Sequence, residues 1–343
     1  MTNGVLILFG SLIILMMLRF PISFALGIAS LFTATYLGIP YFNLFQKMAT
    51  GITSFTFMCV PFFIIMAQIM TDGGISDRLT KFSNVLIGRV RGGTALVNCV
   101  VSMFFGGISG SSIADVSSIG SFLIPSMIKE GYDADYSIAV TCTSSVEGVI
   151  IPPSQNMIFY VVAAGSGLSI STMFMCGYLP GFLLTGALML CSYIIAVRKK
   201  YPISEKKSWK ENIVIIREAL LGLVTILIVA VGIVAGVFTA TEAGAIAAVY
   251  AFIVTTFFYK TMNMRKLMGC LLKSLKTLGT IMAIIATSSA FSYCLAYLRV
   301  PTMVANGLLS ISSSPAVGML LMIIMMVILG CFMDMGILLI LLT

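Results

Sequence analysis

The sequence predicts an all-α polytopic membrane protein in which two helical segments are interrupted by non-helical backbone. Of its 343 residues, 59% are hydrophobic and 9% are charged, which is too apolar a balance for a soluble domain. Runs of about 20 apolar residues, long enough to cross a bilayer as helix, recur along the whole chain. The runs are continuous and rich in Leu, Ile, Met and Ala, unlike the short alternating segments of barrel strands.

The apolar runs and the basic clusters together predict a topology. Helices are expected at about 4–18, 22–39, 52–71, 136–163, 172–197, 219–236, 240–259 and 277–297. If the chain starts outside, all but Lys47 and Arg299 of the 20 basic residues fall on one side, which the positive-inside rule makes cytoplasmic. The net charge of +8 is therefore a topology signal, and no nucleic acid partner is implied.

The first interruption is the stretch FGGISGSSIADVSSIGSFLIPSM, from Phe105 to Met127. Non-helical backbone at membrane depth survives only where protein or a water-filled cavity satisfies its polar groups. We therefore predict a re-entrant hairpin over about 94–128 that lines a substrate or ion path. A helix contact lined with small residues is the alternative, and it explains the glycines and serines but neither Asp115 nor Pro125.

The second interruption is VEGVIIPPSQNM, from Val146 to Met157, inside what otherwise reads as one span. Pro152 and Pro153 lack an N–H and displace preceding carbonyls, so the carbonyls near Gly148 to Ile151 lose their helical partners and can face a cation. The alternative is a simple proline kink packed by neighbouring helices.

The spacing of motifs also indicates an internal repeat. RFPISFALG opens the second helix at Arg19, and TATEAGAIA opens its counterpart at Thr239. Later, Gly330, Asp334 and Gly336 occupy the place that Gly106 to Asp115 hold in the first half. On the predicted topology the two halves start on opposite sides, so they are inverted.

Four motifs give the chain its resemblance to a known family. They are GGISGSSIADVSSIGSFLIPSMIKEGY from Gly106, VEGVIIPPSQNMIFY from Val146, GVFTATEAGAIAAVYA from Gly236 and GCFMDM from Gly330. In these motifs, and in their order over essentially the whole chain, the sequence resembles the large membrane subunit of TRAP transporters, the DctM family of the ion transporter superfamily.

The resemblance implies an elevator-type, Na+-coupled importer of an organic acid in the bacterial inner membrane. Its expected partners are a small four-helix membrane subunit, a periplasmic solute-binding protein that delivers the substrate, and membrane lipids. Dicarboxylates, sialic acid and other carboxylates all remain open as substrates. Na+ is the expected coupling ion. No other cofactor and no transition metal is implied, since the eight cysteines form no CxxC pair.

The resemblance also implies the site residues. The substrate region falls on Ser109, Ser111, Asp115 and Asp334. A first Na+ site falls on Ser109, Ser112, Gly148, Ile151 and Pro153, and a second on Gly330 and Met333. A carboxylate at mid-membrane costs about 2.5 to 3.5 kcal/mol without compensation, which favours a cavity or ion beside Asp115 and Asp334. Glu147 and Glu242 are weaker candidates, and the second of them starts a helix, where capping alone would account for it.

The predicted organisation has five parts. They are first-repeat scaffold helices with an amphipathic connector (1–93), the first hairpin and unwound helix (94–163), a connecting helix and basic loop (164–218), second-repeat scaffold helices (219–313) and the start of a second hairpin (314–343). Because the family continues beyond the point that matches Thr343, we expect a C-terminally truncated permease, with a non-functional remnant as an alternative. The loop from Arg198 to Arg217, which contains Trp209, is expected to meet anionic lipid headgroups.

Three rival functions remain on the residues alone. An intramembrane aspartyl hydrolase would use Asp115 and Asp334 as a pair. The chain contains no histidine, which removes Ser-His catalysis and HExxH metal sites, so we expect no enzyme. The second rival is a passive channel, because re-entrant segments also build channels. The third is a proton-coupled carrier.

Overall fold

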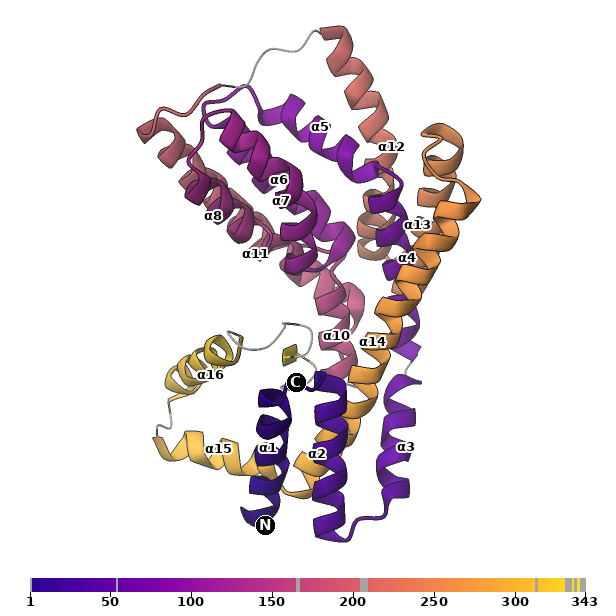
Figure 1. The fold of residues 1–343 in the computed structure, drawn as a ribbon, viewed down its shortest axis with the longest axis vertical. Helices are drawn as coiled ribbons and strands as arrows, with labels where there is room; N and C mark the ends of the chain where they lie inside the picture. The colour runs from indigo at the N-terminus through magenta and orange to yellow at the C-terminus, as the bar shows by residue number, and fades with distance from the viewer. Residues whose placement is uncertain are drawn as a thin grey trace. The chain divides into compact units, whose positions relative to one another are not determined.

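The computed structural model describes residues 2–53, 55–164, 167–203, 209–311, 314–330, 335 and 338–339. Within these ranges the chain is helical, apart from turns and one isolated β-bridge between Arg91 and Ile203 (Figure 1). Four of the described helices are long and apolar enough to cross a membrane, and a bent pair makes up to five. The four are α11 (Ile170–Arg198), α12 (Trp209–Val234), α13 (Ala240–Ile253) with its π-helical continuation η2 (Val254–Phe258), and α14 (Met264–Tyr297).

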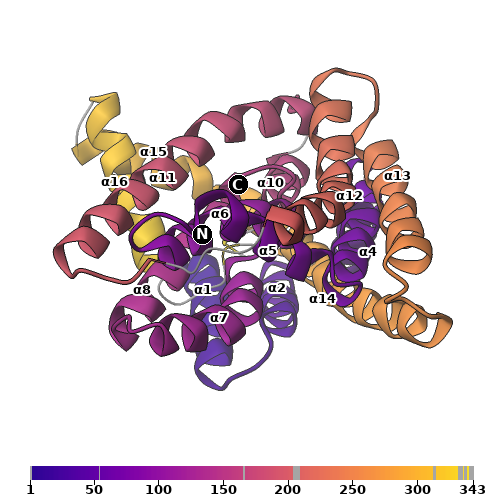
Figure 2. The ribbon, with the colours of Figure 1, turned by 90° about the horizontal axis from the view of Figure 1, so that it is seen from above.

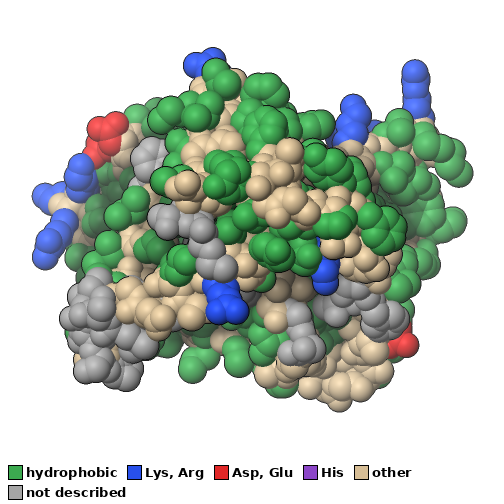
Figure 3. Space-filling model, turned by 90° about the horizontal axis from the view of Figure 1, so that it is seen from below, with side chains coloured by type: hydrophobic (Ala, Val, Ile, Leu, Met, Phe, Trp, Pro, Cys, Tyr) green, Lys and Arg blue, Asp and Glu red, His purple; other side chains and the backbone are tan. Residues whose placement is uncertain are grey.

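The surface agrees with a lipid environment. Large apolar side chains are exposed along these helices, including Leu179 and Leu183 on α11 and Val231 on α12. Hydrophobic side chains cover much of the face drawn in Figure 3, with few acidic ones among them. Apolar patches of this extent are rare on soluble monomers. The predicted class, an all-α polytopic membrane protein, is confirmed.

The chain divides into two compact units, and the first comprises Met1–Phe57 and Thr277–Thr343. Its helices are α1 (Thr2–Met17), α2 (Ile22–Leu37), α3 (Tyr41–Ile52), the C-terminal part of α14, α15 (Val300–Ile311) and α16 (Pro315–Gly330). The core joins Leu8 and Leu12 of α1 to Ala25 and Leu26 of α2 and Phe291 of α14. Burying each of the larger side chains contributes about 1.5 to 3 kcal/mol where the alternative is water.

The second unit, Met58–Lys276, holds both predicted interruptions. Its remaining helices are α4 (Cys59–Asp72), α5 (Ile75–Ile87), α6 (Gly93–Ser109), α7 (Ser112–Lys129), α8 (Ala134–Ser144), α9 (Glu147–Ile150) and α10 (Gln155–Ala164). Helices α4 and α12 both pack on α13, and the three lie together in Figure 2. Helix α6 contacts α5, α7, α8, α9 and α11, so it is the centre of this unit.

Three helix boundaries differ from those predicted. The expected span at 52–71 begins later, and α3 is a separate amphipathic helix before it. Helix α12 begins at Trp209 rather than 219, and α14 at Met264 rather than 277. The apolar runs stop at Lys and Arg residues, but those residues favour helix and can extend their charged ends to water. The predicted topology and the five-part organisation stay predictions.

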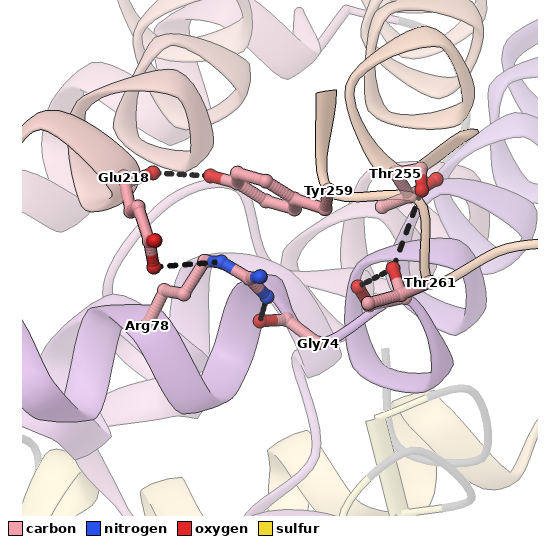
Figure 4. A network of polar contacts seen from close by, with 7 residues as sticks. Gly74, Arg78, Glu218, Thr255, Tyr259 and Thr261 are labelled. Atoms are coloured by element: carbon pink, nitrogen blue, oxygen red, sulfur yellow. Dashed lines mark hydrogen bonds and ion pairs between the residues drawn. The ribbon is translucent and has the colours of Figure 1, made fainter. Parts of the chain in front are cut away.

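The bend between α4 and α5 is held by an extensive polar network (Figure 4). The two helices meet at 67°, and Gly74 between them has φ of +76°, a conformation that favours glycine. Arg78 on α5 donates from Nη1 to the Gly74 carbonyl at 2.9 Å, and its Nε lies 3.3 Å from Oε2 of Glu218 on α12. The Arg78 side chain, which lies one helical turn after Gly74, therefore holds the bend in place.

The same network connects the bend to the end of η2. The Arg78 guanidinium lies 3.8 Å from the centroid of the Tyr259 ring, and the Tyr259 hydroxyl donates to the Glu218 carbonyl. Thr261 donates to the Gly73 carbonyl at 2.6 Å. A Cβ at Gly73 would lie 2.3 Å from Cγ2 of Thr255, so only glycine permits this contact. Three elements distant in the sequence thus converge on one bend.

We predict that Arg78→Ala lowers the free energy of unfolding by about 2 kcal/mol, because it removes a cation–π contact and a hydrogen bond from a charged donor. Thermal unfolding of the purified protein in detergent measures the effect. Lys81→Ala is the matched control, since Lys81 is exposed on the same helix. Equal shifts for the two variants would contradict a specific role for Arg78.

Candidate functional site

Helices α6 and α7 form a helical hairpin over the range 94–128 and pack against each other, while its re-entrance into the membrane stays a prediction. Gly110 forms the turn with φ of +60°, and its N–H bonds to the Gly106 carbonyl at 3.0 Å. Asp115 lies in the first turn of α7 and is completely buried. A carboxylate at this position interacts favourably with the helix dipole. The hairpin thus places one buried acidic side chain next to its turn.

The predicted span at 136–163 is three helices, α8, α9 and α10, and the break between α9 and α10 comprises residues 151–154. In a continuous helix the carbonyls of Gly148 and Val149 would accept from residues 152 and 153, which are prolines without an N–H. The Val149 carbonyl accepts from Ser154 Oγ at 2.7 Å instead. The interruption is therefore a non-helical segment rather than a kink within one helix.

The two interruptions meet at Gly106 and Gly148. A Cβ added at Gly106 would lie 1.9 Å from Cα of Gly148, so the backbones of α6 and α9 are in direct contact. A Cβ added at Gly148 would lie 2.4 Å from Oδ2 of Asp115. Both arms of the hairpin therefore reach the same residue of the broken helix, and the Asp115 carboxylate lies against it.

The hairpin turn also contacts the far side of the break. Asn156, in the first turn of α10, donates from Nδ2 to the Gly110 carbonyl at 2.9 Å. A Cβ at Gly110 would lie 2.5 Å from the backbone nitrogen of Gln155. The hairpin turn is thus held by α10, while Gly106 and Asp115 are held by α9.

A stripe of small and polar residues runs along α6 at every fourth position and ends in the hairpin turn; its members are Thr94, Asn98, Ser102, Gly106 and Gly110. Each member has a defined partner. Asn98 Nδ2 donates to Thr141 Oγ1 of α8 at 2.6 Å, and the hydroxyls of Ser102 and Ser144 lie 3.0 Å apart. Thr94 donates to Oε2 of Glu130 at 2.5 Å. Residues four apart form one ridge of a helix, so the stripe is a continuous packing surface.

Sequence reasoning missed this stripe, although its spacing was a usable signal. Thr94, Asn98 and Ser102 lie inside an apolar run before the glycine- and serine-rich stretch that begins at Phe105, so composition does not single them out. Buried hydrogen bonds between membrane helices contribute about 0.6 kcal/mol each on average. They align α6 with α8 and so determine where Gly106 meets Gly148.

Glu147 is a second completely buried acidic residue beside the break. Its Oε2 accepts from Thr185 Oγ1 of α11 at 2.9 Å, and its Oε1 has no hydrogen-bond partner among the described residues. A Cβ at Gly181, one turn before Thr185, would lie 2.4 Å from Cγ1 of Ile151. Helix α11 therefore packs closely on the broken helix and holds Glu147 in place.

The structure brings together some of the predicted site residues. Asp115 contacts Gly148, and Ile151 and Pro153 are buried in the break. Ser109 ends α6, Ser111 follows the turn and Ser112 begins α7. Gly330 ends α16 in the first unit, while Met333 and Asp334 lie outside the described residues. Glu242 forms a capping box with Thr239 at the start of α13, which accounts for it structurally.

A polytopic helical chain in which a hairpin turn contacts an interrupted helix has the architecture of a secondary transporter. The comparison with known families agrees with this class. The chain matches the family described as "Tripartite ATP-independent periplasmic transporter, DctM component" over residues 9–343, and it belongs to that family.

The chain is also similar to individual permeases. It is 34% identical to the C4-dicarboxylate TRAP transporter large permease protein DctM of Rhodobacter capsulatus, with 96% of this chain and 78% of that protein covered. It is 34% identical to the sialic acid TRAP transporter large permease protein SiaM of Vibrio cholerae, covering 84% and 67% respectively. It is 35% identical to the uncharacterized protein YgiK of Salmonella typhimurium, covering 96% and 76%.

We predict that Gly106→Ala destabilises the second unit by about 1 to 3 kcal/mol, the usual range for overpacking. The reason is that the added methyl group meets backbone rather than a flexible side chain. Thermal unfolding in detergent is the measurement. Gly186→Ala in α11 is the control, because a Cβ there meets nothing within 4 Å. A Gly106 variant as stable as this control would contradict the close backbone contact.

Proposed function

We propose that the chain is the permease subunit of a Na+-coupled importer of an organic acid, working by an elevator movement in the bacterial inner membrane. The contact of Asp115 and the hairpin with Gly148 is the observation that carries the proposal. Two of its relatives are named for anions, a C4-dicarboxylate and sialic acid, and a third is named an isethionate permease. The substrate is therefore proposed to be a small anion.

The electrostatics support cation coupling. A buried carboxylate costs several kcal/mol unless an opposite charge is near it, and an anionic substrate beside Asp115 would add repulsion. A Na+ ion bound by carbonyls of the hairpin and of the Gly148 to Pro153 segment would offset both effects. We propose Ser109, Ser112, Gly148, Ile151 and Pro153 as this first site. Carbonyl and hydroxyl oxygens are suitable ligands for a hard cation.

The rest of the proposal rests on the family. Ser109, Ser111, Asp115 and Asp334 are proposed for the substrate region, and Gly330 and Met333 for a second Na+ site. The proposed partners are a small four-helix membrane subunit and a periplasmic solute-binding protein. Alternating access by inverted repeats needs the hairpin and the broken helix to move as one body. The stripe on α6 is a suitable means of joining them, because it links α6 to α8, α9 and α10.

Uptake into proteoliposomes tests the coupling. With the complex of permease, small subunit and solute-binding protein, and a labelled C4-dicarboxylate and labelled sialic acid as probes, we expect uptake to vanish when Na+ is replaced by K+ at constant membrane potential. Uptake that persists in K+ would reject Na+ coupling. Uptake driven by a pH gradient alone would favour a proton-coupled carrier, and flux at pore-like rates would favour a channel.

A binding measurement tests the cation site without any partner. A ligand at 100 times its Kd stabilises a protein by about 2.7 kcal/mol, so NaCl is expected to raise the unfolding temperature above that in KCl at equal ionic strength. Asp115→Asn is expected to abolish this difference. Asp135→Asn, an exposed change of the same type, is the control and retains it. A Na+-specific shift that persists in Asp115→Asn would show that Asp115 does not contribute to cation binding.

A further inference from the structure

A cavity of about 330 Å³ lies away from the hairpin, and its lining residues are Asp72, Lys266, Gly269 and Lys273. Asp72 is the last residue of α4, and the other three belong to the first turns of α14. The loop before α14 is attached to α4, because Thr261 donates to the Gly73 carbonyl at 2.6 Å. The cavity is therefore built by packed elements of one unit.

The charge of the cavity is positive. Two ammonium groups and one carboxylate leave one net positive charge on its lining. The Asp72 carboxylate is already compensated, since its Oδ2 accepts from Lys273 Nζ at 2.8 Å, Gln68 Nε2 at 2.9 Å and Cys270 Sγ at 3.3 Å. Lys266 Nζ donates to the carbonyl of Thr261 at 2.9 Å, which is a neutral acceptor. Asp72 thus orients Lys273, and no carboxylate among the lining residues neutralises the charge of Lys266.

The surrounding sequence increases this positive potential. No Asp or Glu occurs from Ala243 to Met333, whereas Lys260 lies in the loop before α14 and Arg265 in its first turn. Gly269 leaves room above the helix, because a Cβ at that position would meet nothing within 4 Å. The site therefore combines two cationic side chains with open space between them, as an anion requires.

The opposite face of the same helix identifies the source of the anion. Met264, Met268, Leu272 and Leu275 are exposed and recur at spacings of four, four and three residues, which is one side of a helix. Phe257 and Phe258, at the end of η2, are also exposed. Aromatic and basic residues at the end of an apolar span are typical of the membrane interface. This pattern indicates that the first turns of α14 lie at the level of the lipid headgroups.

We propose that this cavity binds the phosphate group of an anionic phospholipid, with Lys266 and Lys273 as its ligands. Basic pockets between membrane helices are suited to such headgroups. The phosphate would bridge the two ammonium groups, and bound lipid would join α14 to the end of α4. The proposal concerns the membrane boundary of the second unit and is independent of Na+ coupling and of the substrate.

Native mass spectrometry of the purified protein, with any subunit that copurifies, tests the proposal. The probes are phosphatidylglycerol and phosphatidylcholine with identical acyl chains, added to delipidated protein. We expect preferential binding of phosphatidylglycerol. Lys266→Gln is expected to weaken it roughly fivefold, the effect of one lysine near an anionic surface. Lys276→Gln removes the same charge from the same helix outside the cavity and is expected to change it less than twofold.

A second pair of variants separates the cavity from general electrostatics. Gly269→Leu fills the cavity without changing any charge and is expected to abolish the preference, whereas Gly269→Ala, which tests the tolerance of the helix, retains it. Equal losses in Lys266→Gln and Lys276→Gln would overturn the proposal, and so would normal binding by a folded Gly269→Leu protein. If inorganic phosphate displaces the lipid at a comparable concentration, the site binds free phosphate and the proposal of a lipid ligand is wrong.

Discussion

The contact between the backbones of Gly106 and Gly148 is the constraint on which the second unit depends. No side chain fits between α6 and α9 at this point, so both residues must be glycine for the hairpin and the broken helix to meet. This approach brings Asp115 against Gly148 and allows Asn156 to reach the Gly110 carbonyl. A buried acidic group and free backbone carbonyls, each costly alone in a membrane, are thereby placed side by side, as the proposed cation site requires.

Small and polar residues of α6 and α11 determine how the helices align, because apolar packing alone does not drive helices together in lipid. Lipid tails are as apolar as leucine, so membrane helices associate through close packing of small residues and through hydrogen bonds. On α6 these are the bonds of Asn98 and Ser102 to α8, and on α11 they are the packing of Gly181 against Ile151 and the bond of Thr185 to Glu147 of α9. Both surfaces use residues spaced by four, and the broken helix lies between them.

The network around Arg78 performs a different task in the same unit. It holds the bend between α4 and α5 to α12 and to the end of η2, so the helix that leads into α6 starts from a fixed position. The cavity at Lys266 adjoins the same loop, through Thr261. The bend and the cavity are thus connected through a few polar side chains, none of which is part of the proposed cation site.

Composition and local chemistry alone determined the class of the protein and the places where its helices break. An excess of apolar residues requires helices in lipid, and Pro152 and Pro153 cannot donate hydrogen bonds, whatever surrounds them. Only the tertiary structure decided which residues meet. The pairing of Gly106 with Gly148, of Asn98 with Thr141 and of Glu147 with Thr185 depends on how helices distant in the chain are aligned, and local propensity carries no information about that alignment. The cavity at Lys266 cannot be predicted from the sequence for the same reason, because Asp72 is far from Lys266 in the sequence but lines the same cavity.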